Sequence, residues 1–444
     1  MTDNKDKNVL NSSIEREQND SICSAECEKI KGSKNLNVPA LRFPEFTDEW
    51  KEVLFASNLE RLENGANYNT NDKDGVPMSR IETISTGRID YTKVGHCSTP
   101  QKIEHYIMRY GDILFSHINS LKHIGKTAYY SAEEPLYHGM NLLLFRCKNN
   151  VDSKFFFFLI NNTHFIRKCQ ILAKQAVNQA SISTSDLKKI KVYIPDINEQ
   201  SKIQKFLSLI EKRIELQNKI IEDLKKLKSA IIEALFCAPK ESMPAKRLSS
   251  YSKEWKLVKL SDICHRVQTK NIGRQCSQVL TIAAQYGLVN QEDFFNKTVA
   301  SENLEAYYLL QKGDFAYNKS YSGDYAWGAI KRLERYEHGV LSPLYICFRP
   351  DTTKVDADYL TYYFESKKWH KGIADIAGEG ARNHGLLNIS VIDFFNTIHR
   401  IPDLDEQKNI AQVINSLSSK LSCEQHIMQS LTTQRNYLLH EMFI

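Results

Sequence analysis

The chain has 444 residues, of which 42% are hydrophobic and 25% charged, and its net charge is +6. This composition is ordinary for a soluble globular protein, and the length favours two or more domains. The longest purely apolar run, from Phe155 to Ile160, has six residues, whereas a membrane helix needs roughly 20, so we expect no membrane span.

The first 38 residues predict a flexible polar tail, because they are rich in Asn, Ser, Lys and Glu and show little apolar periodicity. They contain no apolar signal core, so we expect a cytoplasmic protein. The ten cysteines include no CxxC pair, and Cys23 and Cys27 have no second pair at a zinc-finger interval. Reduced thiols are therefore favoured over a metal site.

After this tail, the chain contains one unit twice. The sequence IPDINEQSKI at 194–203 recurs as IPDLDEQKNI at 401–410, and the offset of 207 residues continues without a gap to the end of the chain. Earlier landmarks repeat in the same order, namely Glu-Trp-Lys at 49–51 and 254–256 and Gly-Asp at 111–112 and 313–314. Several matches in register indicate a duplicated unit of about 205 residues. Between the landmarks the two halves differ widely in sequence. This is expected for a duplicated scaffold that carries two different recognition regions, although two functionless copies that diverged would look similar.

Residues 39–195 and 241–402 are predicted to form two globular domains of mixed short strands and helices. The Gly-Asp pairs are interpreted as hairpin turns without chemistry, each followed by a strand. The aromatic stretches at 155–158 and 359–364 predict buried helix rather than a platform for stacking bases. Aromatic residues at continuous or helical spacing pack more often than they bind.

Polar and basic loops in these domains are candidates for DNA contact, because Asn, Gln, Arg, Lys and Ser side chains can pair with base edges or phosphates. Two loops follow the strands after the Gly-Asp pairs, and two precede a repeated Ser-x-x-Asp sequence. Solvated loops have the same composition, and that alternative stays open. The candidates are Ser116, His117, Asn119, Lys122, His123, Lys174, Gln175, Asn178, Gln179, Asn318, Lys319, Ser320, Tyr321, Arg382, Asn383 and His384.

A long helix is predicted after each Ile-Pro-Asp sequence, over residues 196–240 and 403–444. Proline suits a helix start, Asp196 and Asp403 are suitable caps, and the acidic Glu199 and Glu406 lie in the first turn. Apolar residues then recur at alternating steps of four and three, the spacing of a coiled-coil seam. This predicted helix-pair and partner-docking seam comprises Ile203, Leu207, Ile210, Ile214, Ile221, Leu224, Ile410, Ile414, Leu417, Leu421, Met428 and Leu431.

Two polar positions interrupt the seam at matching places, Gln217 with Glu424 and Lys228 with Arg435. A helix of about 38 residues would be roughly 57 Å long. We favour packing of the two helices on each other, which would hold the domains apart, over packing of each helix on its own domain. The seam does not determine the direction, but a pseudo-twofold relation between similar domains favours an antiparallel pair.

The sequence shows no catalytic signature. Gly125-Lys126 lacks the upstream glycine of a phosphate-binding loop, and neither the Asn-Pro-Pro-Tyr of an adenine methyltransferase nor an HExxH zinc motif occurs. We therefore expect a protein that is not an enzyme by itself and holds no cofactor or metal ion. A non-DNA adaptor, in which a coiled coil spaces two protein-binding domains, is the alternative.

Over about residues 38–444, the chain resembles the specificity subunits of type I restriction-modification enzymes. The resemblance rests on the segment at 38–46 followed by Glu49-Trp50, on Ile-Pro-x-x-x-Glu-Gln-x-x-Ile at each long helix, on the Gly-Asp pairs, and on Asn388-Ile-Ser390 before Asp393. The first half departs from this pattern, since Ala180-Ser-Ile-Ser183 stands where the second half has Leu387-Asn-Ile-Ser390.

The resemblance implies an α/β fold with two similar target-recognition domains separated by two long antiparallel coiled-coil helices. Each domain would read one half of a bipartite site in double-stranded DNA. The implied partners are two methyltransferase subunits, which dock on the helices and carry S-adenosylmethionine, and restriction subunits that use ATP with Mg²⁺. The chain itself would be the specificity component of a DNA adenine methyltransferase and type I restriction endonuclease complex.

Overall fold

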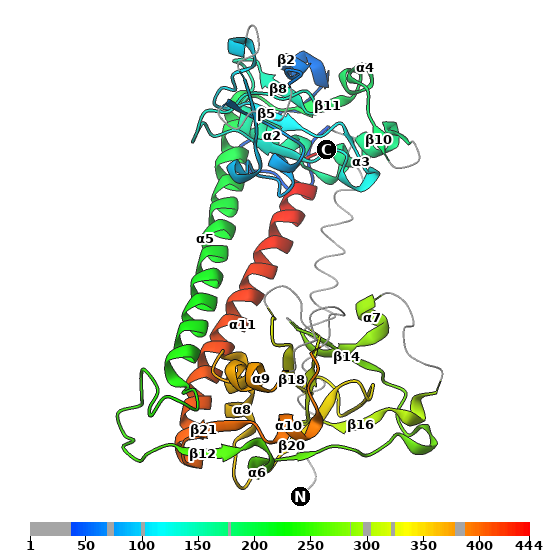
Figure 1. The fold of residues 1–444 in the computed structure, drawn as a ribbon. Helices are drawn as coiled ribbons and strands as arrows, with labels where there is room; N and C mark the ends of the chain where they lie inside the picture. The colour runs from blue at the N-terminus through cyan, green and yellow to red at the C-terminus, as the bar shows by residue number, and fades with distance from the viewer. Residues whose placement is uncertain are drawn as a thin grey trace, which may run out of the picture. The chain divides into compact units, whose positions relative to one another are not determined.

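The computed structural model describes residues 37–68, 75–98, 103–175, 179–284, 286–295, 303–320, 325–377 and 387–444. These residues fall into two compact units, the first from Met1–Glu215 with Gln429–Ile444 and the second from Leu216–Met428. Two helices of 39 and 38 residues, α5 (Ile197–Leu235) and α11 (Leu404–Glu441), contribute to both units (Figure 1). The predicted tail at 1–38 lies outside the described residues except for its last two positions.

The first unit is built around a four-stranded antiparallel sheet of order β2-β8-β5-β7. Phe55 lies in the core of this unit, and its ring centroid is 5.2 Å from that of Phe145 and 5.3 Å from that of Phe156. The aromatic stretch predicted as buried helix lies in α2, whose phenylalanines are all buried. The elements are β2 (Leu59–Asn64), β8 (Leu143–Cys147), β5 (Ile113–Phe115), β7 (Thr127–Tyr129), α2 (Ser153–Ile160) and α3 (Thr163–Leu172).

Smaller elements complete the first unit. Two strand pairs are β1 (Lys51–Leu54) with β11 (Lys191–Ile194) and β3 (Val76–Met78) with β4 (Gly95–Cys97). A three-stranded sheet has the order β6 (Ile118–Asn119), β10 (Ala180–Ser181), β9 (Lys174–Gln175). The short helices are η1 (Phe55–Asn58), η2 (Glu82–Ile84), η3 (Tyr91–Lys93), η4 (Ile103–Tyr106), η5 (Leu121–His123) and α4 (Thr184–Lys188).

The second unit has a sheet of corresponding order, β13-β20-β17-β18. Phe315 and Phe348 stack across it with centroids 5.4 Å apart. The stretch at 359–364 lies in α8, and its described aromatic residues are buried as predicted. The elements are β13 (Cys264–Arg266), β20 (Ile346–Pro350), β17 (Phe315–Asn318), β18 (Ala329–Arg332), α8 (Ala357–Glu365) and α9 (His370–Ile376).

The second unit also contains three strand pairs outside this sheet. They are β12 (Lys256–Lys259) with β21 (Ile398–Ile401), β14 (Leu280–Ala283) with β15 (Gly287–Asn290), and β16 (Tyr308–Gln311) with β19 (His338–Leu341). The short helices are α6 (Leu260–Ile263), α7 (Gln291–Phe295), α10 (Val391–Phe395), η6 (Ile272–Arg274) and η7 (Leu304–Ala306).

The repeated Gly-Asp pairs form turns, but the prediction of hairpins was wrong, because the flanking strands pair elsewhere: β5 with β7 and β8, and β17 with β18 and β20. Each pair also anchors a neighbouring strand. Gly111 and Gly313 have φ of +91° and +95°, in the left-handed region that favours glycine. The Asp112 carboxylate is buried and accepts a hydrogen bond from Arg146 Nε in β8 at 2.7 Å. In the second unit, Arg349 Nε in β20 donates to the buried Asp314 carboxylate at 2.6 Å.

Within each unit, α5 and α11 pack against each other. In the second unit, Gln217 contacts Glu424, and Ile232 shares a hydrophobic core with Ile410. In the first unit, Arg435 pairs with Glu211, and residues near the start of α5 share a core with residues near the end of α11. Rising residue numbers along α5 thus meet falling numbers along α11, so the two segments are antiparallel in each unit.

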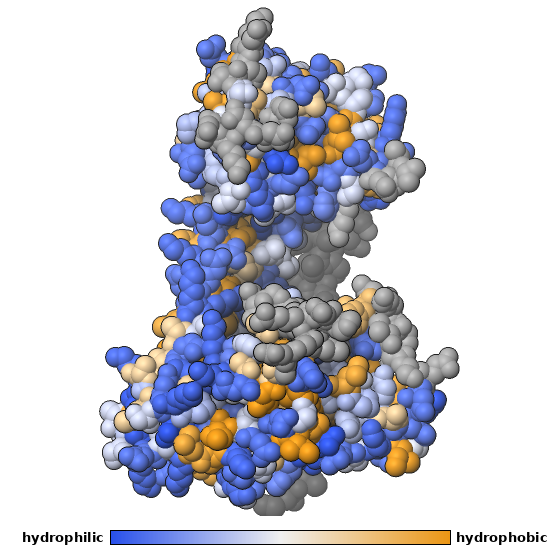
Figure 2. Space-filling view, in the orientation of Figure 1, coloured by the Kyte–Doolittle hydropathy of each residue, from blue (hydrophilic) through white to orange (hydrophobic). Residues whose placement is uncertain are grey.

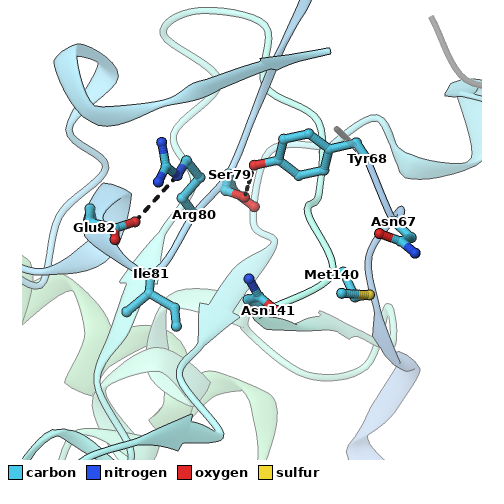
Figure 3. Close-up of a pocket in the computed structure, with 8 residues that line it drawn as sticks. All are labelled: Asn67, Tyr68, Ser79, Arg80, Ile81, Glu82, Met140 and Asn141. Atoms are coloured by element: carbon cyan, nitrogen blue, oxygen red, sulfur yellow. Dashed lines mark hydrogen bonds and ion pairs between the residues drawn. The ribbon is translucent and has the colours of Figure 1, made fainter. Parts of the chain in front are cut away.

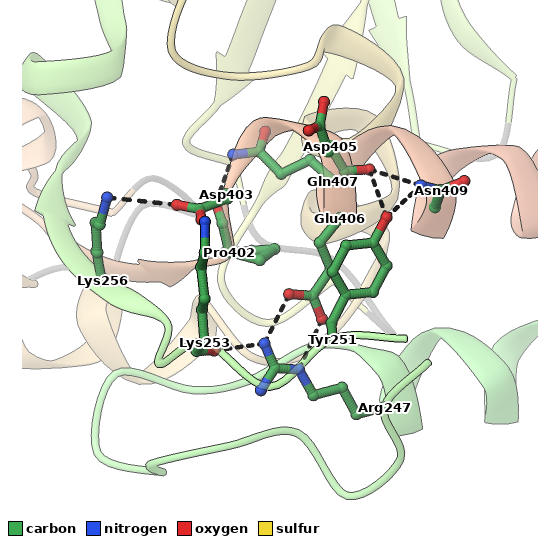
Figure 4. A network of polar contacts seen from close by, with 10 residues as sticks. All are labelled: Arg247, Tyr251, Lys253, Lys256, Pro402, Asp403, Asp405, Glu406, Gln407 and Asn409. Carbon is green, nitrogen blue, oxygen red and sulfur yellow. Dashed lines mark hydrogen bonds and ion pairs between the residues drawn. The ribbon is translucent and has the colours of Figure 1, made fainter. Parts of the chain in front are cut away.

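A hydrogen-bond network, which we call the helix anchor, fastens the start of a long helix in each unit. In the second unit it consists of Arg247, Glu406 and Gln407 (Figure 4). The Arg247 guanidinium donates to both Glu406 carboxylate oxygens at 2.8 Å, and Gln407 Nε2 donates to the Pro402 carbonyl at 2.9 Å. Gln407 Oε1 accepts the N–H of Asp356, the residue that caps α8. One network therefore joins the helix start, the preceding strand and the sheet-covering helix.

The first unit repeats the helix anchor with Arg42, Glu199 and Gln200. Both Arg42–Glu199 distances are 2.7 Å, and Gln200 Nε2 donates to the Pro195 carbonyl at 3.0 Å. Gln200 Oε1 accepts the N–H of Asp152, which caps α2. Both glutamates are almost fully buried. The Glu-Gln of the repeated sequence is thus part of a buried anchor in addition to lying in the first turn of the helix.

The described surface carries mostly hydrophilic residues on the face in view, with apolar side chains in small groups among them (Figure 2). Among the described helices, none has both the length and the apolar character needed to cross a membrane. The eight described cysteines are all free thiols. Cys23 and Cys27 lie outside the described residues. In the part of the chain that the structure describes, no metal-binding group of three or more His, Cys, Asp or Glu side chains is found.

Candidate nucleic-acid interface

In the first unit, the fold brings two of the predicted DNA-contact loops together. The small sheet pairs Ala180 of β10 with Asn119 of β6 on one side and with Gln175 of β9 on the other. Lys174 and Gln175 are exposed, and Asn119 is half-buried. Polar groups 56 residues apart in sequence, at 119 and 175, therefore lie on one short sheet. Gln179, also exposed, directly precedes β10.

Two other candidates in these loops are buried. Ser116 has no exposed surface and His117 is 7% exposed. Burial lowers the pKa of His117 to about 4, which keeps the imidazole neutral near pH 7. The carbonyl of His117 accepts the N–H of Ile182, so this residue links the two loops through its backbone. A DNA contact by either side chain would require the loop to open.

Three further candidates for DNA contact in the first unit are His123, Lys122 and Asn178. His123 is half-buried at the end of η5. The side chain of Lys122 and the whole of Asn178 lie outside the described residues.

The second unit places its corresponding loops together as well. The N–H of Leu387 donates to the Lys319 carbonyl at 2.9 Å, and Lys319 Nζ lies 3.4 Å from the Ile389 carbonyl. Asn318 Oδ1 accepts the N–H of Ser320 at 3.0 Å, which shapes the turn after β17. Asn318, Lys319 and Ser320 are half-buried. Tyr321, Arg382, Asn383 and His384 lie outside the described residues.

The Ser-x-x-Asp sequence that follows these loops is a helix cap. Ser183 Oγ accepts the N–H of Asp186 and donates to its carboxylate, at 3.0 and 2.6 Å. Ser390 and Asp393 repeat both bonds at 3.0 and 2.7 Å. The repeated motif thus starts α4 and α10 at matching places.

A polar hollow in the first unit was not singled out from the sequence (Figure 3). It is lined by Asn67, Tyr68, Ser79, Arg80, Ile81, Glu82, Met140 and Asn141. Its volume is about 150 Å³, whereas one water needs roughly 10–15 Å³ on this scale, so a larger group can enter. These residues come from three separate segments, which explains why local sequence patterns did not reveal the site.

Hydrogen bonds, two between backbone groups and one to the Ser79 hydroxyl, tie the three segments of the hollow together. The N–H of Ala66 donates to the His138 carbonyl and that of Met140 to the Ala66 carbonyl, both at 2.9 Å. The N–H of Gly139 donates to Ser79 Oγ at 3.0 Å. A Cβ atom at Gly139 would lie 2.2 Å from the Ser79 carbonyl oxygen, so this close approach requires glycine.

The predicted seam residues are buried or half-buried in both long helices. At the polar position between them, Gln217 Nε2 donates to the Glu424 carbonyl at 3.1 Å and to its carboxylate at 2.5 Å. Hydrogen bonds from Lys420 and then Gln217 lower the pKa of the Glu424 carboxyl. At the other polar position, Lys228 pairs with Glu365 of α8 at 3.0 Å rather than with α11.

Comparison with known proteins identifies the first repeat. Residues 51–226 match the family model of the type I restriction modification DNA specificity domain. The type I restriction enzyme MjaX specificity subunit of Methanocaldococcus jannaschii is 38% identical to the present chain over 239 residues. This match covers 52% of the present chain, and the chain spans only 56% of the length of that relative.

Solved structures show the same fold at low sequence identity. The S subunit of a type I restriction-modification system from M. genitalium is 15% identical with a TM-score of 0.51, and the match covers 92% of this chain and 99% of that one. A chain from a structure on complex assembly and conformational transition of the type I R-M system is 13% identical, also with a TM-score of 0.51, and the match covers 88% and 96%. Residues 51–226 thus match a type I restriction modification DNA specificity domain, and about half of the chain is similar in sequence to a specificity subunit of that family.

Proposed function

We propose that the chain is the DNA-recognition subunit of a type I restriction-modification complex, in which each repeat reads one part of a bipartite DNA site. The chain itself would carry out no reaction and bind no cofactor. Two methyltransferase subunits would dock on the long helices and supply S-adenosylmethionine. Restriction subunits that use ATP with Mg²⁺ would be further partners, and the complex would act in the cytoplasm.

The observation that carries this proposal is the contrast between constant anchors and variable contents in the two units. The helix anchor, the Asp–Arg pair of the sheet and the Ser-x-x-Asp cap recur with matching geometry. The segments between them differ in sequence, and it is there that the polar loops lie. Two units with the same buried contacts but different polar loops are what we expect of a protein that reads two different DNA sequences.

The antiparallel packing of α5 and α11 in each unit supports the idea of a helical spacer. A polar contact at one seam position, Gln217 with Glu424, is a known means of setting the register of a helix pair. A defined register would set a defined distance between two DNA half-sites. This finer layout, with recognition domains separated by the helix pair, is part of the proposal.

Co-expression with the matching methyltransferase subunit tests the proposal. The strain should acquire adenine methylation in one split sequence, detected by methylome sequencing. DNA binding by the purified complex should weaken steeply as salt rises, because phosphate contacts release counterions. Absence of any bipartite methylation, with binding that does not respond to salt, would instead favour the adaptor function.

A further inference from the structure

We propose that the polar hollow of the first unit is a subsite that reads a G·C base pair, with Arg80 on the guanine and Glu82 on the cytosine. This inference rests on the proposed function and assigns residues to it. Arg80 and Glu82 lie side by side at the rim, with Arg80 Nε 3.4 Å from Glu82 Oε2 (Figure 3). Both side chains are exposed, at 43% and 59%.

The chemistry of this pair suits the major-groove edge of a G·C pair. An arginine can donate two hydrogen bonds to O6 and N7 of guanine, and a glutamate can accept one from the N4 amino group of cytosine. A phosphate would be attracted by Arg80 but repelled by Glu82. The adjacent carboxylate therefore favours base reading over backbone binding.

Because the ion pair of Arg80 and Glu82 is exposed, both side chains can give it up for contacts with base edges. Exposed pairs contribute little to stability, since both partners are solvated. Arg80 and Glu82 could thus leave each other for base edges at small cost. By contrast, the ion pairs of the helix anchors are buried and hold their partners in place.

Two amides extend the donor and acceptor set around the hollow. Asn67 and Asn141 are exposed, and neither side chain is hydrogen-bonded to another residue that the structure describes. Asparagine can form paired hydrogen bonds with adenine. Hydrogen bonds already hold the segments that carry these amides, so little order would be lost on binding.

The test uses the complete complex with its methyltransferase subunits and duplexes that carry each base pair in turn at every position of the site. Arg80→Ala and Arg80→Lys should each reduce discrimination at one G·C pair by about 5-fold to 150-fold, because lysine keeps the charge but lacks the planar fork. Glu82→Gln should relax the same position. The half-site read by the second unit should be unaffected.

Arg88→Ala is the matched control, because Arg88 is also an exposed arginine of the first unit in an ion pair, with Glu215 at 3.6 Å. Thermal unfolding of each variant verifies that the fold is kept. Uniform weakening over all duplexes with a smaller salt slope would make Arg80 a phosphate contact and overturn the inference, as would unchanged discrimination. A wild-type complex that methylates no split site would overturn the proposed function, and this inference with it.

Discussion

The two units contain equivalent buried contacts, whereas their solvent-exposed segments differ in sequence. The same ion pair occurs in both units, as Arg42–Glu199 and as Arg247–Glu406. Each arginine also donates to the backbone carbonyl of the residue six positions later, Asp48 in the first unit and Lys253 in the second. In contrast, the polar hollow of the first unit is lined by residues with no sequence counterpart among the repeated landmarks. If the proposed function holds, stability and recognition reside in different residues, and mutation can separate them.

The largest effect is expected from the helix anchors. Glu199→Ala and Glu406→Ala should each lower the free energy of unfolding by about 3–5 kcal/mol, because each leaves a buried arginine without its partner. Urea denaturation at pH 7 measures this loss. Lys253→Ala, which breaks only the exposed pair with Asp403, is the control and should leave the free energy of unfolding nearly unchanged, because both charges are solvated. If one glutamate mattered and the other did not, the equivalence of the two anchors would be wrong.

The Asp–Arg pairs of the two sheets should differ, because their arginines are not equally buried. The side chain of Arg146 is 9% exposed and that of Arg349 is 48% exposed. Arg146→Ala should cost about 3–5 kcal/mol, whereas water can replace Arg349, so Arg349→Ala should cost about 1–3 kcal/mol. Equal losses in urea denaturation would contradict the role of burial.

Acid should destabilise the first unit more than the second. Burial lowers the pKa to about 4 for His117 and His138 in the first unit and for His399 in the second. A histidine with a lowered folded-state pKa gives full stability above its unfolded value near 6.5, and this stability falls as pH drops toward 4. The loss is about 1.4 kcal/mol per pH unit for each histidine.

Hydrogen exchange at pH 7.5 and 5.5 can follow the two units separately. His117→Gln should flatten the pH dependence of the first unit, while substitution of the exposed His426 by Gln serves as the control. A first unit whose stability does not change over this range would show that these imidazoles are not buried in solution.

The smallest effect is expected at the polar layer between the long helices. Gln217→Leu removes the hydrogen bonds from Gln217 to the Glu424 carbonyl and to the Glu424 carboxylate, which keeps Lys420 at 2.6 Å, and should cost about 1 kcal/mol. Replacing both Gln217 and Glu424 by Leu should recover this loss, because no polar group then remains unpaired. A double variant less stable than the single one would show that the layer contributes to stability and not only to register.

Much of the fold could be predicted because it is encoded in local, repeated patterns. Heptad spacing, Ile-Pro-Asp helix starts and Gly-Asp turns each depend on nearby residues, and the corresponding helices and turns are present. The role of Glu199 could not be predicted, because its partner Arg42 is 157 residues away. The hollow was missed for the same reason, since Asn67, Arg80 and Asn141 meet only through tertiary contacts. The polarity of His117 predicts a DNA contact, but its burial depends on the packing of the loop, which the local sequence does not show.

The exchange of one repeat tests the central claim most directly. Lys51 pairs with Ile194 and Lys256 pairs with Ile401, so residues 51–194 can replace residues 256–401 between equivalent strand partners. The resulting chain, in complex with the methyltransferase, should methylate a split sequence whose two half-sites are identical. Methylome sequencing gives the result. Retention of the original site, or a site that is not split, would contradict the account of two independent reading units.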